Sequence, residues 1–390
     1  MSRNEDIIKR SFQSWRITVA ILLGLGIAGF MVYSSLSKVY FIENPRHGTH
    51  EWIDFNQNGK VDPSVAEEFI PSPNGTYKQQ QLGDILTEIS WTTQSFFWIF
   101  LSLCFMVGRD AAYMMRIRTL TNNELNWLQS FHVIMIWEFA SALSPGVVGG
   151  TAVAMFILNK EKIELGRSTA IIIVTAMMDN LFFILTVPVI FLFIDTSVLF
   201  PVEEVRASSI KYLFWLAYSI KLILSLLLVT SIFIYPKLIQ KLLLAIFRLT
   251  FLKKWKNIAE KTGAEIVLTS AIMKKEKFGF WFRTALSTCL SWISRYLVIN
   301  CIIAAFVDIN LMQHLIILGK QFMLWIIMMV SPTPGGSGVA EFAFGKLMLG
   351  LGASSLLLSG LAVIWRLISY FPYLFIGAII LPRWLKRKSS

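Results

Sequence analysis

The sequence predicts an all-α polytopic membrane protein formed by two halves of opposite membrane topology. First, the 390 residues are 55% hydrophobic, and apolar runs of about twenty residues, long enough for a helix to cross the hydrocarbon core, recur along the chain. Second, Lys and Arg gather in the short loops between these runs. Third, a Gly-Gly motif preceded by Ser-Pro occurs twice, at residues 149 and 335, which indicates two related halves.

The net charge of +12 is explained by membrane topology and does not indicate a nucleic-acid partner. The positive-inside rule concentrates Lys and Arg in cytoplasmic loops, and most of them lie in such segments here. The three cysteines are far apart within apolar segments, so the sequence indicates neither a disulfide framework nor a metal site. It contains no nucleotide-binding or protease motif. We therefore expect no cofactor and no enzymatic activity.

The first half begins with an expected membrane anchor at residues 17–36, which follows a basic segment. The hydrophilic loop 37–90 has eight acidic and four basic residues, so the positive-inside rule makes it extracytoplasmic. Residues 91–108 are expected to cross back to the cytoplasm, where Arg109 and Arg116 would belong to a basic loop.

Residues 131–158 are expected to form a re-entrant hairpin, because basic segments precede and follow them. Its arms, 131–143 and 151–158, are too short to cross a core of roughly 30 Å at about 1.5 Å per residue. The residues from Pro145 to Gly150 supply the bend.

Residues 169–194 would complete the first half by crossing outward, and the second half repeats the pattern in inverted orientation. Its expected segments are spans at 210–234, 284–306 and 355–381 and a second hairpin at 312–351, which enters from outside. The loop 235–283 carries eleven Lys or Arg against three acids and is therefore expected in the cytoplasm. It is interpreted as an amphipathic helix on anionic lipid or, alternatively, as a solvated linker.

The prediction is thus one transmembrane domain, residues 1–390, with an inverted-topology repeat that divides it into 1–194 and 195–390. It has six spanning helices and two re-entrant hairpins, about eight hydrophobic segments. Both termini are expected in the cytoplasm, with the protein in the cell inner membrane.

The two Gly-Gly motifs predict a binding site, because broken helices at matching places in two repeats are typical of transporter sites. A helix that begins at each break has unpaired N–H groups, and glycine lets an anion approach them. The residues concerned are Gly149, Gly150, Thr151, Gly335, Gly336 and Ser337. The alternative is that the small residues only allow close helix packing, and that the two hydroxyls cap their helices.

Eight charged residues fall inside apolar segments: Glu138, Asp179, Lys221, Arg295, Lys320, Glu341, Lys346 and Arg366. Such groups are costly in lipid and tend to face a cavity, a partner or water. For the three lysines, an alternative is that they extend to the membrane surface or lie at a shallow depth. Each carboxylate either couples charge to transport or pairs with Arg295 or Arg366.

A weak calcium motif lies in the outer loop at Asp54, Asn56 and Asn58, followed by Gly59. The twelfth position is Val65, so the closing bidentate Glu of a calcium loop is missing. A plain polar turn is the favoured interpretation, and no other metal site is expected.

The run Ser-Pro-Thr-Pro-Gly-Gly-Ser-Gly-Val-Ala-Glu at 331–341, with Arg366 in the next span, resembles a family signature. It is similar to the transmembrane region of lysylphosphatidylglycerol synthases, the flippase part of multiple peptide resistance factors. Ser144, Pro145 and Asp179 are compatible with it, and the resemblance covers roughly residues 90–385. It suggests a stand-alone member without the aminoacyltransferase domain that full-length members carry.

The resemblance implies a lipid translocator whose partner is a membrane lipid with an anionic headgroup, either a phospholipid or a polyprenyl-phosphate-linked lipid. Arg295 and Arg366 would attract its phosphate, and Asp179, Glu341 and Glu138 would balance or couple charge. We expect Arg366 to face the phosphate rather than Asp179. The alternative functions are a membrane-embedded transferase, or accessory subunit, acting on lipid-linked sugars, and a scaffold without transport.

Overall fold

The computed structural model describes residues 33, 37, 39–45, 47–55, 57, 59, 61, 65–81, 91–144, 148–200, 204–246, 256–330, 333, 335–336, 338–353 and 355–389. The expected anchor 17–36 lies outside this set apart from Tyr33. Asn56 and Asn58 of the calcium motif, and Pro145 and Ser337 at the breaks, also lie outside it.

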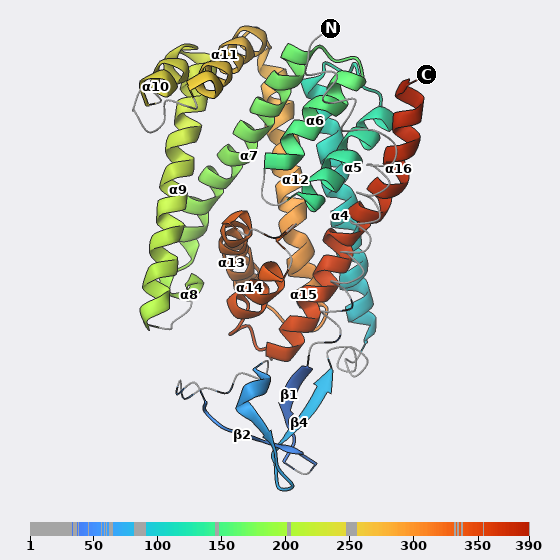
Figure 1. The fold of residues 1–390 in the computed structure, drawn as a ribbon, viewed down its shortest axis with the longest axis vertical. Helices are drawn as coiled ribbons and strands as arrows, with labels where there is room; N and C mark the ends of the chain where they lie inside the picture. The colour runs from blue at the N-terminus through green and yellow to red at the C-terminus, as the bar shows by residue number, and fades with distance from the viewer. Residues whose placement is uncertain are drawn as a thin grey trace.

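Long helices dominate the described residues (Figure 1). Six segments among them are long and apolar enough to cross a membrane: Thr93–Leu120, Leu165–Phe193, Phe214–Phe233, Phe278–Ala304, Leu311–Met328 and Leu357–Arg387. The predicted class, an all-α polytopic membrane protein, is therefore confirmed. One of the six differs from expectation, since Leu311–Met328 corresponds to the first arm of the expected second hairpin.

Helices α4 (Thr93–Leu120) and α12 (Phe278–Ala304) pack side by side along the molecule (Figure 1). The Ser95 hydroxyl donates to the Ala305 carbonyl at one end of the pair, at 2.7 Å. The prediction that the first of these helices ends near residue 108 is wrong. The chain contains no helix-breaking sequence until Thr121, after which Asn122 and Asn123 adopt positive φ values and turn the chain.

Two shorter helices, α5 (Trp127–Leu143) and α6 (Val148–Lys160), pack against each other around the first break. The N-cap residue Asn126 and Gln129 cap the start of α5 reciprocally. After α6 the chain continues into α7 (Leu165–Phe193), the short α8 (Thr196–Leu199) and α9 (Glu204–Phe233).

The second break lies between α13 (Leu311–Val330) and α14 (Val339–Leu347). Helix α14 has only nine residues, too few to cross a membrane. Two end-to-end helices, α15 (Ser355–Ser369) and α16 (Phe371–Ser389), follow it. In Figure 1, α5 and α6 lie toward the end of the bundle that carries α10 and α11, whereas α13 and α14 lie toward the opposite end.

The loop 37–90 contains a small antiparallel sheet that the sequence interpretation did not predict. Its strands are β1 (Val39–Glu43), β2 (His50–Trp52), β3 (Phe69–Pro71) and β4 (Tyr77–Gln81), in the order β1-β4-β2-β3, with a 3-10 turn at Ala66–Glu68. Phe41 stacks on Phe69 at 4.3 Å between ring centroids and closes a small core. In the calcium motif, the Gly59 amide donates to Asp54 Oδ2 at 2.8 Å, as in a polar turn, and no metal-ligand cluster occurs among the described residues.

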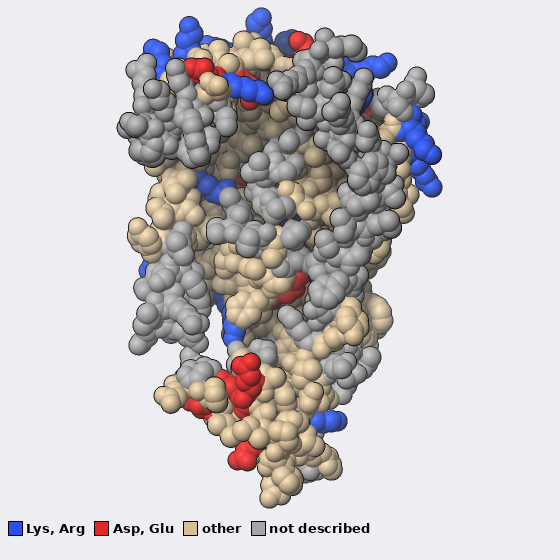
Figure 2. Space-filling model, in the orientation of Figure 1, with Lys and Arg blue, Asp and Glu red and all other residues tan. Residues whose placement is uncertain are grey.

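The two ends of the bundle differ in charge. Helices α10 (Leu238–Ile246) and α11 (Lys256–Met273) lie at the end that also carries the C-terminus, and the sheet lies at the other end (Figure 1). Lys and Arg gather at the first end, and Asp and Glu gather at the sheet (Figure 2). This asymmetry is the one that the positive-inside rule associates with cytoplasmic and outer faces.

Candidate functional site

Arg109 lies in a buried polar cluster between α4, α5 and α16, with 1% of its side chain exposed. Its Nη2 atom lies 2.7 Å from Oε1 of Glu138, an ion pair that lacks hydrogen-bond geometry. Its Nη1 atom donates to the Tyr373 hydroxyl, which donates in turn to Asp110 at 2.7 Å. The rings of Tyr113 and Tyr373 lie 4.9 and 5.0 Å from the guanidinium. Paired carboxylates and aromatic faces therefore stabilise this cation among apolar helices.

A second cluster joins α4, α7 and α12 around Asp179. Arg116 Nη1 lies 2.5 Å from Oδ1 of Asp179, and the indole N–H of Trp292 donates to the same oxygen at 2.8 Å. Arg116 also donates to the Thr288 hydroxyl at 3.3 Å. Asp179 near the middle of α7 is thus neutralised by α4, and 28% of its side chain is exposed.

Two further cations flank a pair of tryptophans. Lys221 on α9 donates to Oδ1 of Asn180 at 2.8 Å and lies 4.3 Å from the ring centroid of Trp325. The guanidinium of Arg295 lies 5.1 Å from the ring centroid of Trp292. The two indoles meet edge to face at 5.7 Å. Cations from two helices therefore each contact one ring of the same aromatic pair.

Among the residues that the structure describes, this central network contains one more cation than carboxylates. The cations are Arg109, Arg116, Lys221 and Arg295, and the carboxylates are Asp110, Glu138 and Asp179. Arg295 is the least neutralised arginine, since its Nη2 atom lies 3.9 Å from Oε2 of Glu138 and 35% of its side chain is exposed. An excess cation within apolar helices favours the binding of an anion.

Arg366 holds the second helix break in place. Its Nε atom donates to Oε1 of Glu341 at 2.9 Å, and its Nη2 atom donates to the Gly335 carbonyl at 2.9 Å. Glu341 in turn accepts from the Gly338 amide at 2.6 Å, at the start of α14. The side chains of Arg366 and Glu341 are 4% and 13% exposed, so this is a buried ion pair. It ties the break to α15.

The two breaks are joined through Tyr370, between α15 and α16. The Tyr370 hydroxyl donates to the Ala142 carbonyl, near the end of α5, at 2.9 Å. Its ring lies against Gly335, where an added Cβ would approach Cε2 of Tyr370 to 2.2 Å. The first break and the second break therefore contact the same side chain.

The structure gives Arg366 and Asp179 different partners from those expected. Arg366 pairs with Glu341, which was one of the alternatives, and so it has an anion of its own in place of a phosphate. Asp179 pairs with Arg116, and Glu138 pairs mainly with Arg109 and only at 3.9 Å with Arg295. The absence of an Asp179–Arg366 pair agrees with the prediction.

The glycines of the breaks pack closely in this conformation. An added Cβ on Gly150 would lie 2.1 Å from the Ser141 hydroxyl, and Gly335 faces Tyr370. Gly149 lies with Gly150 in the first turn of α6, and Gly335 and Gly336 have φ values of +56° and +70°. The side chains of Thr151 and Ser337 lie outside the described part of the chain.

Two of the three lysines have polar partners on neighbouring segments of the bundle. Lys320 on α13 is 8% exposed and donates to the Leu349 carbonyl, just after α14, at 3.0 Å. Lys221 lies against Asn180 and Trp325 as described above. Lys346 lies 5.8 Å from the ring centroid of Phe342.

Sequence reasoning missed Arg109, Asp110 and Arg116 because it assigned them to a cytoplasmic loop. The sequence does carry a signal for them: the apolar pattern continues past Arg109 and stops only at Thr121. A helix of 28 residues then places these charges inside the bundle.

Comparisons with known proteins agree with this architecture. The family model described as the lysylphosphatidylglycerol synthase transmembrane region matches residues 77–377. A UPF0104 membrane protein of Archaeoglobus fulgidus is 22% identical over 303 residues, which cover 75% of this chain and 89% of that protein. No solved structure matches.

Proposed function

Because the chain belongs to the lysylphosphatidylglycerol synthase transmembrane-region family, we propose that it moves a lipid with a phosphate headgroup across the cell inner membrane. The observation that carries this proposal is the unbalanced charge of the central network. Lys221 and Arg295 come from different helices, and neither has a carboxylate closer than 3.9 Å among the described residues. A lipid phosphate is the anion that a membrane supplies to such a pair.

In the proposed mechanism, Lys221 and Arg295 hold the phosphate next to the Trp292–Trp325 contact. The side chains of the paired cations Arg109 and Arg116 are less than 8% exposed, so they contribute to the positive potential of the site without contacting the lipid. The carboxylates Asp179 and Glu138 are 28% and 23% exposed, so they are the groups that couple charge when the lipid leaves.

The proposed transport cycle uses the two helix breaks as opposite gates. Pairs α5–α6 and α13–α14 would be re-entrant hairpins from the two faces, within an inverted repeat that keeps both termini cytoplasmic. The charge asymmetry of Figure 2 and the opposite positions of the pairs in Figure 1 support this assignment. Alternating contacts of the breaks with Tyr370 would then open the central network to one face at a time.

The test is lipid movement in reconstituted vesicles. Fluorescent phosphatidylglycerol in the inner leaflet becomes accessible to a membrane-impermeant quencher only after it crosses. We expect the wild-type protein to move it faster than fluorescent phosphatidylcholine, because the ammonium group of choline neutralises the phosphate of that headgroup and leaves no net charge for the cations to bind. Arg295→Gln and Lys221→Gln should each lower the rate about tenfold, as expected for the loss of a charge-assisted contact of about 1.5 kcal/mol.

Lys346→Gln is the matched control, since it removes a cation that contacts Phe342 outside the network. It should leave the rate of phosphatidylglycerol movement unchanged. Equal movement of both lipids by the wild type, or full activity of the Arg295 and Lys221 variants, would refute the proposed role of the network.

A further inference from the structure

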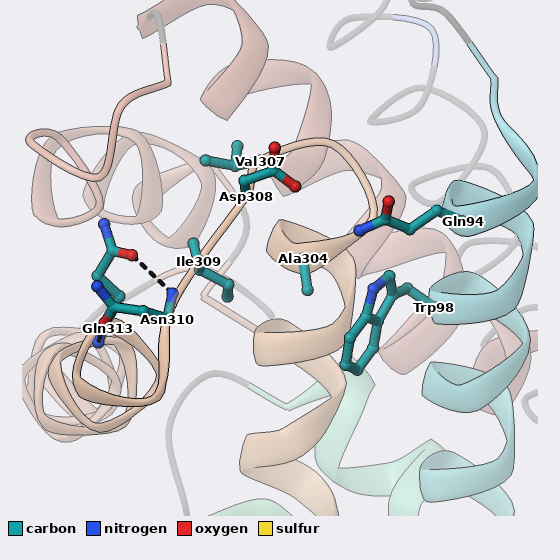
Figure 3. Close-up of a pocket in the computed structure, with 8 residues that line it drawn as sticks. All are labelled: Gln94, Trp98, Ala304, Val307, Asp308, Ile309, Asn310 and Gln313. Carbon is teal, nitrogen blue, oxygen red and sulfur yellow. Dashed lines mark hydrogen bonds between the residues drawn. The ribbon is translucent and has the colours of Figure 1, made fainter.

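A separate pocket opens at the sheet-bearing end of the bundle, away from the central network (Figure 3). It has a volume of about 350 Å³ and lies between the start of α4, the end of α12 and the start of α13. Its size falls at the lower end of the roughly 300–1,000 Å³ range of small-molecule sites. The Ser95–Ala305 hydrogen bond holds the ends of α4 and α12 together beside it.

The polar lining consists of amides and one carboxylate. Gln94 lies on one side of the pocket, Asn310 and Gln313 lie on the other, and Asp308 lies at its rim (Figure 3). Asn310 and Gln313 exchange hydrogen bonds at the start of α13 through their side-chain oxygens, at 2.8 and 3.0 Å. Their NH₂ groups are therefore left as donors, while Gln94 and Asp308 supply acceptors.

The remaining lining is apolar, and Trp98 is its largest member. The indole extends along the pocket one turn below Gln94 on α4 (Figure 3). No Lys or Arg is among the lining residues, which are all described by the structure. A phosphate is therefore disfavoured here, in contrast to the central network.

We propose that this pocket binds the sugar ring of a glycosylated lipid headgroup on the sheet-bearing face. A pyranose has hydroxyl groups that both donate and accept, and it has apolar C–H faces. The amides and Asp308 match the hydroxyls, and the broad face of Trp98 matches the C–H surface. The inference rests on the proposed function, because it assigns the pocket to the lipid that the central network would move.

Retention of lipids by the purified full-length protein tests this assignment. The protein is placed in nanodiscs of phosphatidylcholine that contain equal small amounts of monoglucosyl diacylglycerol, phosphatidic acid and phosphatidylethanolamine. Native mass spectrometry then measures which lipids remain bound. Monoglucosyl diacylglycerol probes the sugar pocket without a phosphate, and phosphatidic acid probes the central network without a sugar.

We expect the wild type to retain both probe lipids in preference to phosphatidylcholine. Trp98→Leu and Gln94→Leu should each lower retention of the glucosyl lipid about fivefold, with retention of phosphatidic acid unchanged. Gln94 is exposed and caps no helix, so its variant separates binding from folding. Phe100→Leu, an exposed aromatic position on the same helix, is the matched control and should retain both lipids.

The outcomes separate this inference from the proposed function. If the glucosyl lipid is retained no better than phosphatidylcholine while phosphatidic acid is retained through Arg295, the sugar assignment is wrong and the proposed function stands. If the wild type retains phosphatidic acid no better than phosphatidylcholine, the proposed function is contradicted instead. Preferential retention of phosphatidylethanolamine would contradict the sugar assignment, because it would show that Trp98 and Asp308 bind an ammonium group. Free methyl glucoside is added to the same nanodiscs in a separate measurement. If it binds as well as the glucosyl lipid does, the assignment of the pocket to a lipid headgroup is wrong.

Discussion

The two helix breaks occupy matching places in the sequence, but they are held by different forces. At the second break, the buried pair Arg366–Glu341 fixes the loop carbonyl of Gly335 and the start of α14. At the first break, the position that matches Glu341 is Met155, and the described contacts are neutral: the close approach of Gly150 to Ser141 and the bond from Tyr370 to Ala142. Among the described residues, an ion pair thus fixes the break in the second half, and none is found at the break in the first half.

This difference predicts which of the two helix breaks opens more easily during transport. Separating a buried ion pair costs more than separating neutral contacts, because each charge would be left in apolar surroundings. We therefore expect the α5–α6 break to shift against Tyr370 more readily than the α13–α14 break opens around Arg366.

Removal of the ion pair at the second break should have the largest effect. Glu341→Ala leaves Arg366 buried without its carboxylate, which we expect to lower the free energy of unfolding by about 3–5 kcal/mol. The matching change at the first break, Met155→Leu, conserves volume and should cost less than about 1.5 kcal/mol. Unfolding in mixed detergent micelles, followed by tryptophan fluorescence, measures both.

The charge-reversed double variant, Glu341→Arg with Arg366→Glu, should recover part of the loss, since the two side chains can still pair. Asp179→Arg with Arg366→Asp should recover nothing, because Asp179 contacts Arg116 instead. If Glu341→Ala and Met155→Leu lower the free energy of unfolding equally, the ion pair does not distinguish the second break from the first.

Much of this architecture could be predicted from the sequence, and the missing parts share a physical cause. Hydropathy and loop charge identified the spans, because polar groups are costly in lipid and a spanning segment must therefore be mostly apolar. Arg109 and Arg116 were assigned to a loop by the same rule, since charge alone does not distinguish a loop from a buried pair. Their partners Glu138 and Asp179 lie 29 and 63 residues away in the chain, so only the packing of α4, α5 and α7 reveals them.

The sheet in the loop 37–90 was missed for a related reason. Its strands have three to five residues each, and β4 is mostly Gln, so hydrophobic alternation is weak. The pairing of β1 with β4 joins residues far apart in the loop, as in the register Val39 to Gln81. The Glu341–Arg366 pair, by contrast, was among the pairings considered from sequence, because both residues belong to one motif and the span that follows it.

Glycine replacements at the second break should have the next largest effect. Gly335→Ala combines a positive φ of +56° with a Cβ that would lie 2.2 Å from the Tyr370 ring, and we expect a loss of roughly 2–4 kcal/mol. Gly336→Ala has a φ of +70° but no atom closer than 3.4 Å, so only the backbone term of about 1–2 kcal/mol applies. The same unfolding titration compares them.

At the first break, a second substitution is expected to restore the stability that a glycine replacement removes. Gly150 has no positive φ, and its obstacle is the Ser141 hydroxyl at 2.1 Å. Ser141→Gly should therefore restore most of the stability lost in Gly150→Ala. Tyr370→Ala should not restore Gly335→Ala, because the backbone strain stays. Full rescue of both variants would mean that the two breaks differ only in packing.

The smallest expected effect concerns the hydroxyl that joins the two breaks. Tyr370→Phe removes the bond to the Ala142 carbonyl and keeps the ring against Gly335, so we expect a loss of about 1 kcal/mol in the free energy of unfolding. If the first break moves against Tyr370 during transport, the same change weakens the closed state and should raise the rate of lipid movement by up to about fivefold. Tyr218→Phe is the matched control, since that hydroxyl also donates to a backbone carbonyl, Ile184 at 3.1 Å, on helices away from the breaks. It should lower stability by a similar amount and leave the rate unchanged. Equal rates in the two variants would show that Tyr370 only packs, and that the neutral contacts of the first break do not set the speed of transport.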